Sequence, residues 1–400
     1  MADAISMEMG APMDWATDSQ TSSGQSHLED FILRLKEFKF DRKFNSESNN
    51  RICYEPIGVC GLITPWNWPI NQITLKVLPV IATGCTCILK PSEHTPLSAM
   101  VYAEILDEAG VPDGVFNLVH GDGEGVGVSM SRHPDIEMMS FTGSKRGGKS
   151  VTIESAETVK KVTLELGGKS PNIVFADCDL DEKVKDSVNE CMFNTGQSCD
   201  APTRLLVEKK CYAEVLEIAK QAAENISLGD PTKEGDHLGP LFDKIQYDRV
   251  QTMIKVGIDE GVTLLTGGLG KPEGFETGWY TKPTIFADVT NDKRVAQEEI
   301  FGPVLCLLKY ESEEEAIEIA NDTEFGLAGY VQGELSHAIE VGNQIRAGQI
   351  TINGGARGNG APFGGYKSSG NGREHGLSGL NECLETKAST QRVASSLAFS

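Results

Sequence analysis

Short apolar runs alternate with helix-like segments along the chain from Gly58 onward. The strand-like runs cover residues 59–64, 85–90, 116–120 and 137–142, and the helix-like segments cover residues 75–82, 98–109 and 125–132. Strands that are separated by helices form parallel sheets covered by helices. The alternation therefore predicts an α/β protein whose ligands bind beyond the carboxyl ends of the strands, where Lys90, Thr142 and Glu165 fall.

A second α/β segment is predicted after Gly167-Gly168, which could act as a hinge. Its strand-like runs cover residues 172–175 and 205–208, and its helix-like segments cover residues 180–192, 212–225, 243–260, 313–321 and 336–345. A glycine-rich stretch at 354–372 closes it and suggests close backbone packing or a loop that faces a ligand. Ahead of both segments, residues 1–40 are predicted to be helical, 41–50 a turn or edge, and 51–55 a short strand. A chain of 400 residues exceeds one hydrophobic core, so two or more domains are expected.

Composition excludes several classes of protein. The net charge of −22 argues against nucleic acid or an anionic membrane surface as the main partner, and no apolar run reaches the ~20 residues of a membrane-spanning helix. The ten cysteines form no CxxC framework, which fits reduced thiols in the cytoplasm. The pair Cys85 and Cys87 lies in an apolar run and is interpreted as core rather than as a metal site, so no metal is predicted.

Cys199 follows a Gly196-Gln197-Ser198 turn and precedes an Ala201-Pro202 break. Glycine permits a sharp or positive-φ backbone, which can place a thiol in a cleft with N–H groups aimed at the atom it attacks. One hypothesis is therefore a nucleophilic cysteine beside an oxyanion hole. The other is a small buried hydrophobe, which is what most free cysteines are. This stretch by itself leaves both open.

Two strand ends are candidates for a cofactor site, although no G-x-G-x-x-G fingerprint is present. The stretch Phe141-Thr-Gly-Ser144 precedes a helix that opens with Gly147-Gly148, so its hydroxyls and the helix N-terminus could take a pyrophosphate, or it could be a plain turn. In Lys90-Pro-Ser-Glu93 the lysine and the acid could bind ribose or phosphate, or the stretch could be a solvated turn.

Two further polar residues stand in unusual settings. Asn67 lies between two tryptophans and two prolines, so its amide is expected to be rigidly held, either as an oxyanion donor or as a cap of the following helix. Glu165 lies between two leucines at a strand end. Burial there would raise its pKa and make it a usable base near neutral pH, unless it simply reaches solvent at an edge.

Together these residues resemble the aldehyde dehydrogenase superfamily, from near residue 1 to about residue 390. The motifs that carry the resemblance are Thr64-Pro-Trp-Asn-Trp-Pro69, Lys90-Pro-Ser-Glu93, Phe141-Thr-Gly-Ser144, Leu164-Glu-Leu-Gly-Gly-Lys169, Asn194-Thr-Gly-Gln-Ser-Cys199, Glu298-Glu-Ile-Phe-Gly-Pro-Val304 and Pro362-Phe-Gly-Gly-Tyr-Lys-Ser-Ser-Gly370. Seven motifs in the family's order make a chance resemblance very improbable.

The resemblance implies a role for each matching residue. Cys199 is expected to be the nucleophile, Glu165 the general base, and Asn67 with the Cys199 backbone N–H the oxyanion hole. Lys76 would be a supporting buried lysine. The predicted cofactor contacts are Ile63, Thr64, Pro65, Trp66, Lys90, Ser92, Glu93, Gly143, Ser144, Leu166, Gly167, Glu299 and Phe301.

Within this set, Lys90 and Glu93 would hold the adenosine ribose, and Ser144 would hold a phosphate. Glu299 and Phe301 would hold the nicotinamide riboside, and Trp66 would line its pocket. Because the Glu93 carboxylate would repel a 2′-phosphate, we predict NAD as the preferred cofactor, with NADP possible.

The family's fold implies a parallel-sheet, Rossmann-like cofactor domain, an α/β catalytic domain and a small β oligomerisation element. The expected boundaries are 1–37 and 57–167 for the cofactor domain, 168–368 for the catalytic domain, 369–384 for a return to the cofactor domain, and 38–56 with 385–400 for the oligomerisation element. A homodimer or homotetramer is expected. Family members usually carry a longer N-terminal region, so the cofactor domain is expected to be incomplete and to expose apolar surface.

The expected reaction is oxidation of a small-molecule aldehyde to a carboxylic acid with NAD(P)+. It would pass through a cysteine thiohemiacetal and a thioester that Glu-activated water hydrolyses. The alternatives are a coenzyme A-acylating enzyme, against which Glu165 counts, and an inactive, truncated binding or structural protein. The aldehyde is not specified by the sequence: Cys306 and Met192 would either line its tunnel or fill the core.

Overall fold

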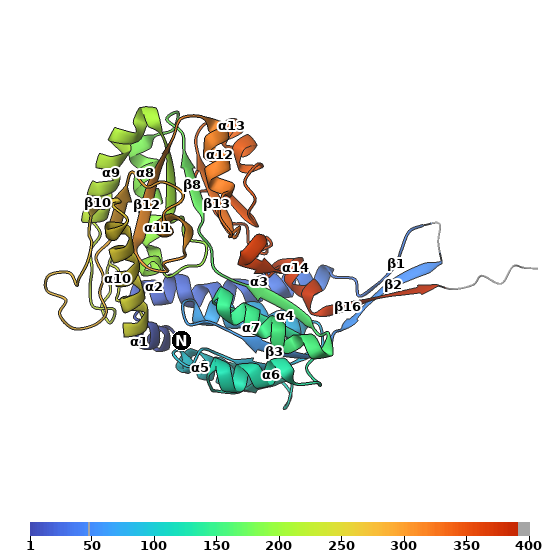
Figure 1. Ribbon diagram of the computed structural model, residues 1–400. Helices are drawn as coiled ribbons and strands as arrows, with labels where there is room; N and C mark the ends of the chain where they lie inside the picture. The colour runs from blue at the N-terminus through green and yellow to red at the C-terminus, as the bar shows by residue number, and fades with distance from the viewer. Residues whose placement is uncertain (47–48, 391–400) are drawn as a thin grey trace, which may run out of the picture.

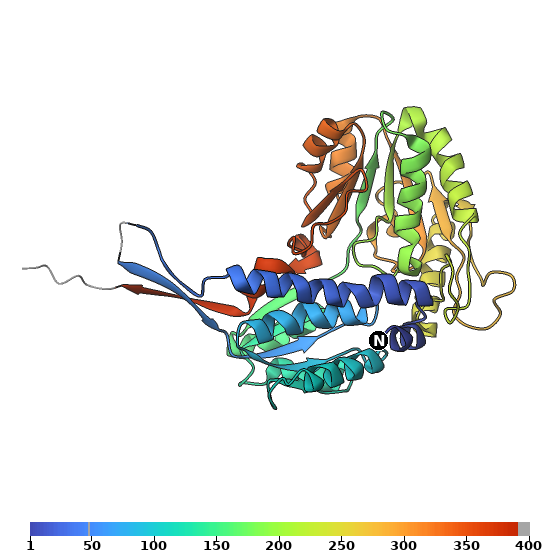
Figure 2. The same cartoon turned by 180° about the vertical axis from the view of Figure 1, so that it is seen from behind.

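The computed structural model describes residues 1–46 and 49–390, and its strands form three sheets. In Figure 1 a six-stranded sheet with its helices forms the lower body, and a seven-stranded sheet with its helices forms the upper body. A three-stranded sheet projects sideways from the lower body as an arm (Figures 1 and 2). The predicted α/β class with parallel-rich sheets is confirmed.

The six-stranded sheet has the order β15-β7-β6-β3-β4-β5. Its strands are β3 (Val59–Ile63), β4 (Thr86–Lys90), β5 (Phe116–Leu118), β6 (Met138–Thr142), β7 (Lys161–Glu165) and β15 (Gly370–Asn371). Its helices are α4 (Pro69–Ala82), α5 (Pro96–Glu108), α6 (Val128–Arg132) and α7 (Lys145–Ser155). All neighbouring strands are parallel except the short β15, which runs antiparallel to β7.

The chain leaves the central strand β3 in one direction to β4 and β5, and later returns beside β3 to form β6 and β7. Ile63 at the end of β3 is in register with Lys90 and with Phe141, and Thr142 is in register with Glu165. The carboxyl ends of four strands therefore form one edge, at the point where the strand order reverses. Ligands of open α/β sheets bind at such an edge, and the predicted placement of these residues there is confirmed.

Two helices begin elsewhere than predicted. Helix α4 starts at Pro69 instead of residue 75, because proline is well suited to the first helical position and because buried polar residues such as Gln72 obscure the apolar periodicity. The helix predicted over 125–132 starts at Val128, after a glycine-rich π-helical turn, Gly123–Gly127, whose Gly125 N–H donates to Asp122.

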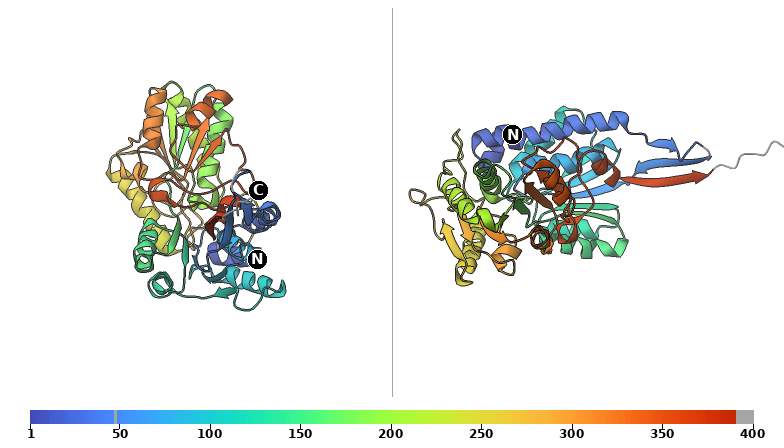
Figure 3. Two further views of the ribbon diagram at one scale, coloured as in Figure 1. Left: turned by 90° about the vertical axis from the view of Figure 1, so that its right-hand side faces the viewer. Right: turned by 90° about the horizontal axis from the view of Figure 1, so that it is seen from above.

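The seven-stranded sheet has the order β10-β11-β12-β9-β8-β13-β14, with only β10 and β11 antiparallel. Its strands are β8 (Pro171–Val174), β9 (Arg204–Glu208), β10 (Thr263–Thr266), β11 (Thr284–Ala287), β12 (Val304–Tyr310), β13 (Ala328–Gln332) and β14 (Gln349–Ile352). Its helices are α8 (Leu180–Met192), α9 (Tyr212–Glu224), α10 (Lys244–Asp259), α11 (Arg294–Gln297), α12 (Glu313–Asn321) and α13 (Leu335–Gly342). Figure 3 shows these helices on both faces of the sheet.

The N-terminal region is helical, as predicted, but it is broken. Its elements are α1 (Ala2–Met9), α2 (Met13–Trp15), a π-helical segment (Ala16–Thr21) and α3 (Ser22–Glu37). Gly10, with a left-handed backbone at φ 78°, ends the first helix. Helix α3 lies along α4 on the lower body, as Figure 2 shows.

The arm consists of β1 (Asp41–Lys43), β2 (Asn50–Pro56) and β16 (Leu384–Thr390), all antiparallel. It joins two segments of the predicted oligomerisation element, and α14 (Gly376–Glu382) leads into it. Residues 391–400 of that element lie outside the described residues, and the oligomeric role stays a prediction. Among the described helices, none combines the length and apolarity needed to cross a bilayer.

Candidate active site

Cys199 follows an unusual reversal of the chain after α8. Asn194, Thr195 and Gly196 have consecutive left-handed backbones, with φ of 53°, 55° and 70°. This conformation is uncommon for non-glycine residues and especially for a β-branched one. A Cβ on Gly196 would collide with the backbone carbonyl of Gly302, so only glycine fits there. The sharp, glycine-dependent bend predicted from the sequence is confirmed.

Hydrogen bonds fix the residues on either side of Cys199. The Trp68 indole Nε1 donates to the Ser198 hydroxyl at 3.0 Å, and the Tyr330 hydroxyl donates to the Asp200 carbonyl oxygen at 3.1 Å. The Gln197 side chain accepts from the Phe242 N–H at 3.1 Å. These bonds hold the loop that carries the thiol in one geometry before any ligand binds.

Asn67 faces this loop and does not cap α4. Its Nδ2 donates to the Gln197 carbonyl oxygen at 2.9 Å, while its backbone carbonyl accepts from the side chains of Gln20 and Asn194. Helix α4 has Trp68 at its N-cap position, with no side-chain cap. The capping alternative is therefore excluded, and the oxyanion role of Asn67 stays a prediction.

Glu165 is buried at the end of β7, so the alternative that it reaches solvent at an edge is wrong. Its Oε2 has no hydrogen-bond partner among the described residues. Burial raises the pKa of this carboxyl well above its usual range, and the nearby charge of Glu374 adds to the effect, while Lys76 and Arg373 oppose it. A carboxylate in this state is a base for pH values near neutrality.

A buried ion pair lies beside Glu165. The Lys76 ammonium donates to Glu374 at 2.6 Å and to the Ser140 hydroxyl at 2.9 Å. This agrees with the supporting lysine implied by the resemblance. Sequence reasoning missed Glu374, because its partner Lys76 lies 298 positions away and no local motif marks the residue.

A cavity of about 120 Å³ brings Cys199, Glu165 and Asn67 together with eight of the predicted cofactor residues. Those eight are Pro65, Trp66, Gly143, Ser144, Leu166, Gly167, Glu299 and Phe301. The other five, Ile63, Thr64, Lys90, Ser92 and Glu93, do not line it and lie at or just after the ends of β3 and β4. Lys90 is buried, and its Nζ donates to the Pro91 carbonyl at 2.9 Å and to Glu93 at 3.2 Å, which excludes a solvated turn for the lysine.

Aromatic rings form one wall of this cavity, which we call the inner cavity. Trp66 stacks on Phe242 with ring centroids 4.0 Å apart and meets Phe301 edge-on at 5.5 Å. Phe301 has a left-handed backbone, φ 61°, and its carbonyl accepts from Gln246 at 2.6 Å. Sequence reasoning missed Phe242, Gln246 and Arg249, because they lie on or beside α10, far along the chain and without a local motif.

Glu299 reaches from the segment after α11 to the loop between the two large sheets. Its Oε1 accepts from the Gly168 N–H at 3.1 Å, and burial raises the pKa of its carboxyl. A Cβ on Gly167 would collide with this carboxylate, so the glycine is required for the approach. The two residues therefore fix the junction between β7 and β8 at the cavity floor.

Two hydroxyls at the end of β6 differ in their partners. Ser144 caps its own helix by accepting from the Gly147 N–H at 3.2 Å, as the plain-turn alternative requires. The Thr142 hydroxyl is buried in the cavity lining without a hydrogen-bond partner among the described residues. A buried polar group without a partner is costly, so this hydroxyl is available to a bound molecule.

The surroundings of the Cys199 thiol disfavour its thiolate form. Burial raises its pKa well above the usual range, and the neighbouring carboxylates of Asp200, Glu299 and Glu165 raise it further, whereas Arg357 opposes them. The thiolate is the nucleophilic form of cysteine. A nearby positive charge or a base is therefore required before the sulfur can react.

Cys199 also lines a second cavity, of about 270 Å³, which we call the tunnel cavity. Its wall includes Trp68, Leu75, Phe193 and Phe363, and Gln72 lines both cavities. The thiol therefore separates the cofactor residues from a hollow whose wall combines aromatic and aliphatic side chains with polar and charged ones, which suits an organic substrate. Cys306 and Met192, for which two roles were open, lie in the hydrophobic core and not in this wall.

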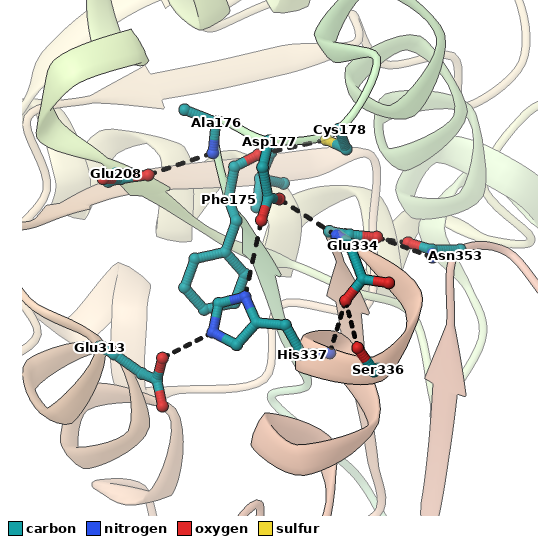
Figure 4. Close-up of polar contacts among 12 residues, drawn as sticks. Phe175, Ala176, Asp177, Cys178, Glu208, Glu313, Glu334, Ser336, His337 and Asn353 are labelled. Atoms are coloured by element: carbon teal, nitrogen blue, oxygen red, sulfur yellow. Dashed lines mark hydrogen bonds and ion pairs between the residues drawn. The ribbon is translucent and has the colours of Figure 1, made fainter.

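Away from Cys199, an ionic cluster joins three segments: the loop after β8, the start of α12 and the helix α13. The His337 ring lies between Asp177 and Glu313, with Nε2 to Glu313 Oε2 at 2.6 Å and Nδ1 to Asp177 Oδ2 at 3.6 Å, and it packs against Phe175 (Figure 4). Hydrogen bonding to Glu313 raises the pKa of His337, and both carboxylates add to the effect against a small cost of burial.

This cluster predicts a pH-dependent stability. The pKa of His337 is higher in the folded protein than in the unfolded chain, where it is about 6.5. Protonated His337 therefore contributes its full stabilisation of the fold below pH 6.5, and this contribution is lost as the pH rises through the folded pKa. We expect His337→Gln to lower the free energy of unfolding by about 0.2–1 kcal/mol in mildly acidic solution. The difference should shrink at alkaline pH, and urea titrations at both pH values measure it. His120→Gln, at an exposed histidine, is the matched control and should not change the free energy of unfolding at either pH. If His337→Gln lowers the free energy of unfolding equally at both pH values, the assignment to the ion pairs of His337 is contradicted.

Comparisons with known proteins were made for the whole chain. A sequence model of the aldehyde dehydrogenase family matches residues 1–389. The 3-succinoylsemialdehyde-pyridine dehydrogenase of a Pseudomonas species is 50% identical over 390 residues, which are 97% of this chain and 81% of that protein. A putative aldehyde dehydrogenase of Staphylococcus haemolyticus is 46% identical over 387 residues, 96% of this chain and 81% of that protein.

Two solved structures have the same fold. An aldehyde dehydrogenase of Bartonella henselae superposes with a TM-score of 0.95 at 51% identity, covering 97% of this chain and 82% of that one. A mutant of aldehyde dehydrogenase C of Pseudomonas syringae, solved with NAD+ and octanal, superposes with a TM-score of 0.95 at 50% identity, covering 97% and 80%.

Proposed function

The chain belongs to the aldehyde dehydrogenase family, and we propose that it oxidises an aldehyde to the carboxylic acid with NAD, through a covalent intermediate on Cys199. One observation carries the proposal: Cys199, Glu165 and Asn67 line one cavity together with most of the predicted cofactor residues. The Pseudomonas syringae relative solved with NAD+ and octanal supports the same pair of ligands.

The residues present fit a dinucleotide. The unpartnered Thr142 hydroxyl and the N-terminus of α7 offer donors to a phosphate, and Lys90 lies at the end of the next strand but one. Trp66 and Phe301 would enclose the nicotinamide riboside, with Glu299 as an acceptor for ribose hydroxyls. The Glu93 carboxylate, next to Lys90, favours NAD because it would repel a 2′-phosphate.

Cys199 would begin the reaction. When bound, NAD supplies a hydride acceptor and a positive charge that favours the thiolate. Once the thiol proton has passed to a base, the sulfur forms a bond to the aldehyde carbon, the carbonyl π bond breaks and its oxygen becomes an alkoxide. The Asn67 amide and the Cys199 backbone N–H would donate to this oxygen, and one such donor is worth about 3 kcal/mol. Loss of hydride from the carbon leaves a thioester on Cys199.

Glu165 would complete the reaction. Its raised pKa allows it to take a proton from water, whose oxygen adds to the thioester carbon. The carbon–sulfur bond then breaks, the acid leaves and the Cys199 thiolate is restored. The Lys76–Glu374 pair beside Glu165 would set the charge around this base.

The product distinguishes this proposal from a coenzyme A-acylating enzyme, in which a thiol replaces water. We expect aldehyde, NAD and protein to give one carboxylic acid per NADH, with a higher kcat/KM for NAD than for NADP. Added coenzyme A should leave the product unchanged, as mass spectrometry of the mixture would show. Formation of acyl-coenzyme A would favour the acylating alternative. No turnover, together with no rise in melting temperature on adding NAD, would favour a binding or structural protein.

A further inference from the structure

The tunnel cavity adjoins a larger hollow of about 490 Å³, which we call the outer chamber. The two share Glu190, Phe193, Asp200 and Arg357 in their linings, so the outer chamber is next to the cavity that holds the Cys199 thiol. The outer chamber lies between the second half of α8 and the segment that follows β14. No substrate group has been assigned to it by the mechanism above.

Carboxylates outnumber cations in the lining of the outer chamber. Asp186, Glu190 and Asp200 face a single guanidinium, that of Arg357. Arg357 is already engaged, with its Nη2 3.1 Å from Asp200 Oδ2 and its guanidinium 4.8 Å from the centroid of the Phe363 ring. The arginine therefore neutralises one carboxylate and leaves the chamber with an excess of negative charge.

The lysines of α8 remove this excess only in part. Lys185 pairs with Asp181 at 2.6 Å. Lys183 pairs closely with Glu182, at 2.7 Å, and its distance to Asp186 is longer, at 3.9 Å. Burial raises the pKa of Glu190, and the charges of Asp200 and Asp186 add to the effect, while Arg357 opposes it.

An unsatisfied acceptor in the chamber wall gives an independent indication. Gln332, at the end of β13, is 5% exposed, and its Oε1 has no hydrogen-bond partner among the described residues. Its Nε2 donates to Asn172 Oδ1 at 3.1 Å, and Asn172 Nδ2 donates to the Ser187 hydroxyl at 2.8 Å. Because Asn172 Nδ2 donates to Ser187, Asn172 presents its oxygen to Gln332, so the Gln332 nitrogen is the end that is bonded and its oxygen is the end that is free. The free end is the oxygen, which carries partial negative charge and requires a donor or a cation.

We propose that the outer chamber binds the distal end of the aldehyde and selects tails that carry a cationic nitrogen over tails that carry a carboxylate. The inference rests on the proposed function and names the substrate class of the same site. A cationic tail would be attracted by Glu190 and Asp186 while the Arg357–Asp200 pair stays intact. An anionic tail would have to displace Asp200 from Arg357 and would face the remaining carboxylates.

A series of three aldehydes of matched shape tests the charge preference. Butanal with a terminal trimethylammonium group is cationic, its tert-butyl analogue is the neutral isostere, and glutarate semialdehyde is the anion of similar length. We expect kcat/KM to be about 2- to 10-fold higher for the cation than for the isostere and lower for the anion, because each exposed charge pair contributes a few-fold. The preference should weaken as salt is added.

Glu190→Gln tests whether the chamber causes that preference. We expect the ratio of kcat/KM for the cation to that for the isostere to fall about 2- to 5-fold. Glu217→Gln is the control, because Glu217 is exposed on α9 and does not line the chamber; its ratio should not change. Preference for the anion, or a ratio that Glu190→Gln leaves unchanged, would overturn the inference while leaving the proposed function intact. Failure to oxidise any of the three, and octanal as well, would refute the proposed function and the inference with it.

Discussion

Replacement of Cys199 by serine is expected to lower kcat for aldehyde oxidation by at least about 10³-fold, since loss of a catalytic nucleophile has effects of this size or larger. The serine hydroxyl is nearly isosteric but far less nucleophilic than a thiolate. The loop itself should be undisturbed, because its geometry depends on bonds from Trp68, Tyr330 and Asn67, and within residues 1–46 and 49–390 no hydrogen bond is made by the sulfur. Aldehyde-dependent formation of NADH in the steady state is the measurement.

The control for this variant is Cys178→Ser. Cys178 is half-buried in the loop after β8, and it lines neither of the two cavities at Cys199. We expect its activity to remain within about two-fold of the original, as is usual for changes away from the site. The Cys199→Ser protein should still show a rise in melting temperature with NAD. Unchanged turnover after Cys199→Ser would remove the thiol from the mechanism.

Replacement of Glu165 by glutamine is expected to lower kcat by about 10²- to 10⁴-fold, the usual contribution of a general base. Glutamine keeps the shape of the side chain but cannot accept the proton from water. If the carboxylate acts in hydrolysis, the thioester forms and then accumulates. Stopped-flow absorbance should therefore show a burst of NADH of one equivalent per site, followed by a slow phase.

The pH dependence of the same step provides a second readout. Because burial raises the pKa of Glu165, kcat of the original protein should fall as the pH is lowered through that raised pKa, where the carboxylate becomes protonated. Glu165→Gln should remove this acidic limb. Glu382→Gln is a suitable control, since Glu382 also lies near Glu165 but pairs with Lys161 at 2.8 Å and does not line the inner cavity. A variant without a burst, with the acidic limb retained, would contradict the role of Glu165 in hydrolysis.

Much of the site was predictable because it is built on strand ends. Lys90 and Thr142 each end an apolar run of the length of a buried strand, Glu165 stands between two leucines at the end of a third strand, and parallel strands bring their carboxyl ends to one edge. The bend at Gly196 was predictable for a similar reason, because a positive φ favours glycine and the residue type can be read directly from the sequence. In both cases the information lies within a few consecutive residues.

The remainder depended on contacts between distant segments. Glu374 meets Lys76 across 298 positions of the chain, and nothing within its own stretch indicates a buried partner. Gln246 and Arg249 reach the inner cavity from a region that carries no motif. Strand β12 was also missed, although it is an apolar run of the same kind as those identified as strands.

The most direct test of the covalent mechanism is the mass of the Glu165→Gln protein after brief mixing with NAD and octanal. Slow hydrolysis in this variant should leave an octanoyl group on the protein. Peptide mapping should locate it on the peptide that contains Cys199, and the double variant with Cys199→Ser should carry none. NADH formation with no acyl adduct on that peptide, or with the adduct on another cysteine, would contradict Cys199 as the nucleophile.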